Sequence, residues 1–156
     1  MKKFNILLIS VFLTNVLSAH CQIPCGIYDD SLRIIQIKEN INTIEKAMNK
    51  ITLLSSESNP QSSQQLVRWV NAKEKHADEI QSILSEYFLA QRITEKKVDY
   101  LKQLSSIHKL MVNSMKCKQT TNVDIIKDSN SLLDNFIDLY FDSHGIEHLK
   151  ALGYLN

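Results

Sequence analysis

Residues 30–51 read DSLRIIQIKENINTIEKAMNKI, and their apolar side chains recur at steps of three and four residues. This spacing places an apolar stripe along one face of an α-helix. Asp30 or Ser31 can open the helix, because either side chain can accept a hydrogen bond from a backbone N–H of the first turn. The stripe consists of Ile34, Ile37, Ile41, Ile44, Met48 and Ile51. The stretch therefore predicts a long amphipathic helix that packs against other helices.

Three further segments show the same helical period, and the polar residues 55–63 predict a linker before the first of them. The second segment directs inward Leu66, Trp69, Val70, Ala77, Ile80, Leu84, Tyr87 and Phe88, and outward the charged residues Lys73, Glu74, Lys75, Asp78 and Glu79. The third, from about Thr94 to Lys118, directs inward Val98, Leu101, Leu104, Ile107, Leu110, Met111 and Met115. The fourth, from about Val123 to Phe141, directs inward Ile126, Leu132, Leu133, Phe136, Ile137 and Tyr140.

Long amphipathic helices with short connections predict an all-α fold, in its simplest form an antiparallel up-down four-helix bundle. The chain has three glycines and two prolines, which leaves little turn material for a many-stranded β fold. The tail, residues 142–156, is expected to add one short helical piece. Residues 20–28 fit none of the helices and are expected to form an irregular hook at the end of the bundle.

Residues 1–19 have the parts of a secretory signal peptide. Lys2 and Lys3 precede an apolar run that ends at Leu17, and Ala19 is a small residue suited to cleavage by signal peptidase. We therefore expect an exported protein, periplasmic or secreted, whose mature domain is residues 20–156. A retained membrane anchor or a misread start of the chain is the alternative.

The net charge of the mature chain indicates which kinds of macromolecule it can bind. Removing residues 1–19 leaves 137 of the 156 residues, with 16 basic and 17 acidic side chains. Nucleic acids and anionic membranes normally require a basic excess. We therefore expect neither as a partner.

The hook, residues 20–28, reads HCQIPCGIY and concentrates metal donors. Cleavage after Ala19 would leave a free α-amine on His20, which forms a five-membered chelate ring with the deprotonated amide nitrogen of Cys21. The thiolates of Cys21 and Cys25 complete a planar set of two nitrogens and two sulfurs, and the His20 imidazole can approach as an axial donor. Such a set favours Ni(II) or Cu(II) over tetrahedral zinc.

Two other interpretations of the hook stay open. Cys21 and Cys25 could form a small disulfide in a structural or interaction module, although so short a loop adds little stability. The hook could also bind nickel or copper in an exported helical protein without turnover. The remaining cysteine, Cys117, is expected to be a free thiol in either case.

The hook pattern His20-Cys21-x-x-Pro24-Cys25-Gly26-x-Tyr28 resembles the nickel hook of nickel-containing superoxide dismutases. The resemblance continues through the helical segments and covers most of the mature chain. It runs through residues 42–46, 68–71, 73–74, 76–77, 86–88 and 114–116.

The resemblance implies a homohexameric four-helix bundle with one nickel ion per subunit. The family converts superoxide to oxygen and hydrogen peroxide by cycling between Ni(III) and Ni(II). Matched by position, His20, Cys21 and Cys25 would be the metal ligands, with the His20 imidazole axial in the oxidised state. Tyr28 would stand beside the open axial face, where it would help to admit small anions and deliver protons.

One position in the helices departs from the family pattern, and two aromatic residues within the resemblance are expected to pack in the core. Family members commonly carry a glutamate early in the first helix that orients the histidine ring, whereas this chain has Gln36 there. Tyr87 lies within a family-like stretch, but its apolar spacing favours core packing. Trp69 is likewise expected in the core.

Overall fold

The computed structural model describes residues 29–154, and this part of the chain is all-helical. The elements in order are α2 (Asp30–Leu54), α3 (Pro60–Ser82), the π-helical segment η1 (Ile83–Arg92), α4 (Tyr100–Gln119), α5 (Asp124–Tyr140) and α6 (Ser143–Ala151). The all-α prediction and the short helix expected in the tail are confirmed. The predicted hook, residues 20–28, lies outside the described residues.

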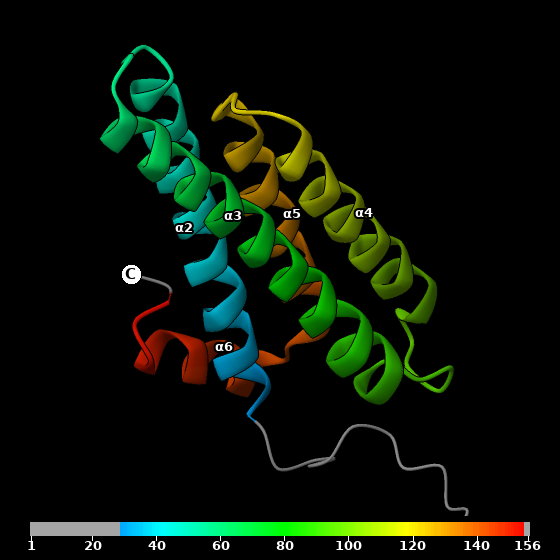
Figure 1. Cartoon of the computed structure of the whole chain (residues 1–156). Helices are drawn as coiled ribbons and strands as arrows, with labels where there is room; N and C mark the ends of the chain where they lie inside the picture. The colour runs from blue at the N-terminus through cyan, green and yellow to red at the C-terminus, as the bar shows by residue number, and fades with distance from the viewer. Residues whose placement is uncertain (1–28, 155–156) are drawn as a thin grey trace, which may run out of the picture.

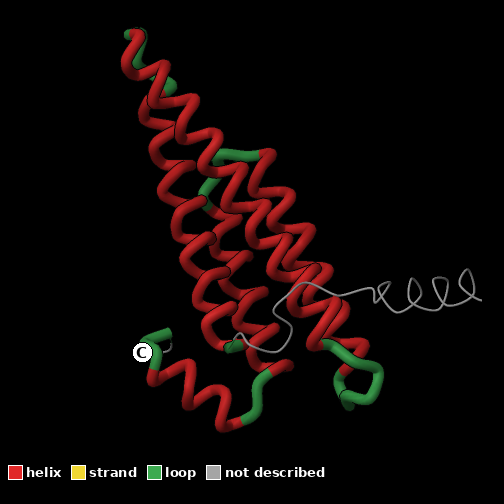
Figure 2. The backbone as a smooth tube through the Cα atoms, turned by 60° about the horizontal axis from the view of Figure 1, so that its bottom comes forward, coloured by secondary structure: helices red, strands yellow, loops and turns green. Residues whose placement is uncertain are grey.

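The four long helices lie side by side, and α6 lies across one end of them (Figures 1 and 2). The turns at 55–59 and 120–123 lie at the upper end of Figure 1. The connection at 93–99, the start of α2 and α6 lie at the lower end. None of the helices between residues 29 and 154 is both long and apolar enough to cross a bilayer.

Helix α2 supplies the central strip of the core. Its predicted stripe is confirmed, since Ile34, Ile37, Ile41, Ile44, Met48 and Ile51 are all buried. Burying side chains of this size contributes about 1.5–3 kcal/mol each before entropy costs. The helix begins at Asp30 as expected, but the capping residue is Asp29, whose Oδ1 accepts a hydrogen bond from the Ser31 N–H at 2.7 Å.

The start of α3 differs from the predicted linker. The linker ends at Asn59 instead of residue 63, because Asn59 caps the helix by accepting a bond from the Ser62 N–H at 2.9 Å. Pro60 suits the first helical position, where its missing N–H is not needed. The expectation for Trp69 is wrong in degree, because its ring is only half-buried and lies 5.9 Å from the Lys46 ammonium.

Helix α4 departs most from the prediction. It begins at Tyr100, not Thr94, which leaves Val98 fully exposed in the preceding loop. Leu101 is 76% exposed and Met115 is exposed as well, so the predicted inward face of α4 is partly outward. The buried face consists of Gln103, Ser106, Ile107, Leu110, Asn113, Ser114 and Cys117.

Polar side chains on the buried face of α4 find partners on other helices. Gln103 donates from Nε2 to the Leu139 carbonyl at 2.8 Å, and the Ser114 hydroxyl donates to the Ala77 carbonyl at 2.8 Å. A buried polar group with a partner costs little compared with an unpaired one. These bonds allow α4 to bury a mixed face and to leave apolar side chains outside.

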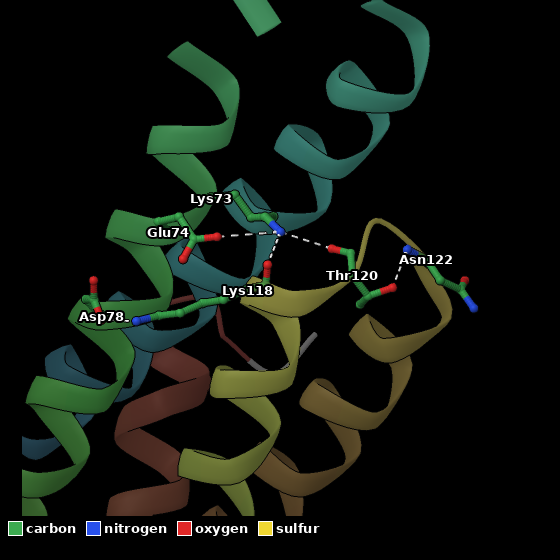
Figure 3. Close-up of polar contacts among 6 residues, drawn as sticks. All are labelled: Lys73, Glu74, Asp78, Lys118, Thr120 and Asn122. Carbon is green, nitrogen blue, oxygen red and sulfur yellow. Dashed lines mark hydrogen bonds and ion pairs between the residues drawn. The ribbon is translucent and has the colours of Figure 1, made fainter. Parts of the chain in front are cut away.

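Lys73 is buried, contrary to the prediction of a solvated charged face on the second segment; its exposed fraction is 5%. Its ammonium donates to the carbonyls of Lys118 at 2.5 Å and Thr120 at 3.1 Å, and lies 3.7 Å from a Glu74 carboxylate oxygen (Figure 3). The last carbonyls of a helix lack partners within the helix and attract a cation. Lys73 therefore closes the C-terminal end of α4 from the neighbouring helix α3.

We predict that Lys73→Met lowers the free energy of unfolding by about 1.5–3 kcal/mol, because hydrogen bonds from a charged donor have that value. Methionine keeps the apolar stem but removes the ammonium. The matched control is Lys75→Met, whose side chain is 73% exposed and whose ammonium pairs with Glu79 at 3.6 Å. Urea unfolding should leave that variant within about 0.5 kcal/mol of the parent. Equal effects of the two changes would contradict the capping role.

Candidate functional site

The described chain begins immediately after the predicted hook. The expected site residues His20, Cys21, Cys25 and Tyr28 lie outside the described residues. Asp29 follows Tyr28 directly, so the described chain begins where the predicted hook would end. We call residues 29–31 the root of the hook.

Asp29 is held from two directions. Its Oδ1 caps α2, as described above, while its Oδ2 lies 3.5 Å from Nδ1 of His148 on α6. The same imidazole nitrogen lies 3.4 Å from the Ser31 hydroxyl. Helix α6 therefore contacts the root of the hook through the His148 side chain.

Asp30 is the centre of a second group of contacts. The Tyr87 hydroxyl donates to its Oδ1, and the Tyr140 hydroxyl donates to its Oδ2 at 2.7 Å. Arg92 forms an ion pair with Oδ1, with Nε at 2.9 Å. We call Asp30, Tyr87, Arg92 and Tyr140 the root cluster.

The π-helical winding of η1 brings together two members of the root cluster. Arg92 donates from Nη2 to the Tyr87 hydroxyl at 2.8 Å, and its guanidinium carbon lies 4.9 Å from the centre of the Tyr87 ring. These residues are five apart, which matches the i→i+5 bonding of a π-helix. The Ile93 N–H bonds to the Phe88 carbonyl, also five residues back, at 3.0 Å. Isolated π-helical turns are frequent at functional sites.

Both tyrosines of the root cluster keep their protons near neutral pH. Burial, followed by the hydrogen bond to Asp30, raises the pKa of Tyr140. The same two causes raise the pKa of Tyr87, although Arg92 opposes part of the effect. Each hydroxyl therefore serves as a donor to the carboxylate of Asp30.

A groove of about 1130 Å³ opens between α2 on one side and α3 with η1 on the other. Its lining is mostly polar and charged, and Tyr87 lies both in this lining and in the root cluster. The groove lining includes Arg33, Gln36, Glu39, Glu86 and Tyr87.

Gln36, at the position where the resemblance expects an acid, lies in this groove. Its Oε1 accepts a hydrogen bond from Nη1 of Arg33 at 2.7 Å. The groove carries carboxylates at Glu39 and Glu86 instead. An acid is therefore available in the same groove from a neighbouring turn of α2 or from η1.

The third cysteine, Cys117, contacts Asn113 and Ser129, which lie outside the root cluster. Cys117 is a buried free thiol, as expected, and its sulfur lies 3.8 Å from the Ser129 hydroxyl. Burial raises the pKa of this thiol. Within residues 29–154, no group of three or more histidine, cysteine, aspartate or glutamate side chains is arranged to hold a metal ion.

Sequence reasoning identified only part of the described site. It placed Tyr87 in the core, where the side chain is indeed buried, and it named Asp30 only as a possible helix cap. Arg92 carried no signal, since a single arginine near a helix end is common. The convergence of Tyr87, Arg92 and Tyr140 on one carboxylate depends on tertiary packing and has no sequence motif.

Comparison with known proteins identifies the family. Residues 15–144 match the family model described as nickel-containing superoxide dismutase. This range includes the hook positions, the root cluster and the four long helices, and it ends within α6. Searches among curated proteins and among solved structures give no significant match. The chain therefore belongs to the nickel-containing superoxide dismutase family, a family of nickel-dependent oxidoreductases.

Proposed function

We propose that this protein disproportionates superoxide to oxygen and hydrogen peroxide at a nickel ion held by the hook. The observation that carries the proposal is the family match over residues 15–144, which spans the donor residues His20, Cys21 and Cys25. The match concerns the family, and the ligand set is our proposal on the basis of the residues present.

The chemistry of the donor residues fits nickel. The α-amine of His20, the amide nitrogen of Cys21 and the two thiolates form a nitrogen and sulfur set of the kind that suits a planar Ni(II) ion. Bound nickel would supply one-electron chemistry between Ni(II) and Ni(III). Tyr28, by its position in the motif, would admit the anion and deliver protons beside the metal.

The described residues can assist an anionic substrate. Three cations surround the two tyrosines of the root cluster: Arg33 and Arg92 lie 5.3 and 4.9 Å from the centre of the Tyr87 ring, and Lys97 lies 4.2 Å from that of Tyr140. Positive potential near a site raises the rate at which anions arrive. We infer that these side chains favour the approach of superoxide to this end of the molecule.

Maturation is part of the proposal because the α-amine is itself a donor. We infer that signal peptidase removes residues 1–19 during export and so creates the amine on His20. The signal peptide would then prevent metal binding before export. The mature enzyme would act in the periplasm or outside the cell.

We also propose that the four long helices form an antiparallel up-down bundle that assembles as a homohexamer. The positions of the turns in Figure 1 support the helix order. Apolar side chains on the outer face of α4 support the assembly, since Leu101 and Met115 are exposed in the single chain. A second copy of the chain could cover them.

We predict that Cys25→Ser abolishes both nickel binding and superoxide consumption, because one thiolate donor is lost. The control is Cys117→Ser, which removes a buried thiol that takes no part in the hook. Metal analysis and a superoxide-consumption assay on the same samples test this. A Cys25→Ser protein with full nickel content and activity would overturn the role of the Cys25 thiolate as a ligand, and a parent without nickel or activity would favour the disulfide interpretation. Stoichiometric nickel without activity in the parent would favour a metal-binding protein without turnover.

We predict that one alanine inserted between Ala19 and His20 strongly reduces nickel binding, since the amine would move away from the imidazole and thiolates. Intact mass and N-terminal sequencing establish where the mature chain begins. A parent that begins elsewhere than His20, yet binds nickel, would overturn the proposed amine ligand.

We predict that Leu101→Glu shifts the protein from the assembled form toward the single chain, because a charge replaces an exposed apolar contact. Sedimentation velocity measures the change. Lys102→Glu, next to it on the exposed surface, serves as a control for the added charge. An unchanged sedimentation coefficient for Leu101→Glu would exclude this face from the interface.

A further inference from the structure

We propose that Asp30 is a positioning residue for the reaction: through its contacts with Tyr87, Arg92 and Tyr140, it fixes the root from which the hook departs. This inference rests on the proposed function, since it assigns a role toward the hook. Asp30 is two residues after Tyr28 and five after Cys25. A shift of its backbone is therefore transmitted through few bonds to the donors.

The contacts come from elements distant in the sequence. Tyr87 on η1 is 57 residues from Asp30, and Tyr140 on α5 is 110 residues away. Both oxygens of the carboxylate are engaged, one by Tyr140 and the other by Tyr87 and Arg92. Donors from two directions restrict both the position and the rotation of the side chain.

The geometry suits a restraint that persists in water. The side chains of Arg92 and Asp30 are 23% and 30% exposed, so the pair is partly shielded from solvent. Hydrogen bonds accepted by an ionised carboxylate are stronger than those between neutral groups, and the ion pair with Arg92 adds to the attraction. The Arg92 guanidinium also lies against the Tyr87 ring and donates a hydrogen bond to the Tyr87 hydroxyl. These two partners of Asp30 therefore contact each other directly.

Tyr87 belongs to the buried core and Tyr140 packs against it, whereas the Asp30 side chain is 30% exposed at the start of α2. The apolar stripe of α2 begins one turn later, at Ile34, and consists of residues whose side chains pack among other apolar side chains. Loss of this carboxylate should therefore leave the helices packed while releasing the first turn of α2. This separates a positioning role from a purely structural one.

The experiment compares isosteric variants of the mature protein, beginning at His20. Asp30→Asn removes the charge, and Tyr140→Phe removes one donor while leaving the carboxylate in place. The matched controls are Asp134→Asn and Tyr154→Phe, which disrupt the other tyrosine–aspartate pair of the described chain that involves α5, with oxygens 3.4 Å apart. The readouts are the nickel dissociation constant by chelator competition, kcat and KM separately, and the electron paramagnetic resonance spectrum of the oxidised, nickel-loaded protein.

We expect Asp30→Asn to weaken nickel retention or to lower kcat by about 10-fold or more, as changes around metal ligands commonly do. Tyr140→Phe should act in the same direction with a smaller effect, and the nickel spectrum should change in both. Asp30→Glu should recover part of the loss because it restores the charge. The two control variants should match the parent in all three readouts.

Two results would overturn the inference. One is parent-like nickel affinity, kcat and spectrum in both Asp30→Asn and Tyr140→Phe, even if thermal unfolding moves. The other is an equal change in the control variants, which would show a general loss of stability. Absence of nickel from the parent protein would instead defeat the proposed function, and this inference with it; the parent sample alone reveals that case.

Discussion

Burial of one isoleucine-rich face of α2 is the interaction on which the rest of the molecule depends. This helix contacts α3 along its length and also meets α5 and α6. Isoleucine side chains are stiff at their first torsion, so they lose little freedom when they pack. Burial of the stripe fixes the direction of α2, and the direction of α2 determines where Asp29 and Asp30 lie at its N-terminal end. Any residue that precedes them is attached to a start point set by this packing.

Helix α2 was predictable because its apolar period and its buried face coincide. For α4 they do not coincide, because the buried face includes Gln103 and Ser114, whose partners are carbonyls on α5 and α3. Periodicity assigns polar residues to solvent and cannot detect an acceptor on another helix. The same reason explains the burial of Lys73, whose acceptors are carbonyls at the end of α4. The predictions failed where tertiary hydrogen bonds replaced apolar contacts.

The proposed metal donors were identifiable from sequence because they lie within six consecutive residues, His20 to Cys25. Their spacing alone states which atoms can form chelate rings. The root cluster offers no such local signal: Asp30 is an ordinary residue for a helix start, and Tyr140 follows an ordinary apolar period. Only the folded chain shows that η1 and α5 direct hydroxyls at the same carboxylate. The identity of the proposed metal donors can thus be read from neighbouring residues, whereas the contacts that hold Asp30 depend on the folded chain.

The long-range contacts of Asp30 bear on the entropic cost of restraining the residue from which the predicted hook departs. Ordering any short segment costs conformational entropy for each residue that is fixed. Contacts over 57 and 110 residues would be costly for a free chain to close, but helix packing has already brought those partners together. The added cost of restraining Asp30 is then mainly that of a few side-chain rotamers. His148 adds a contact from α6, beyond the end of the family match at residue 144. The contacts of the root therefore come partly from a segment that lies outside the matched range.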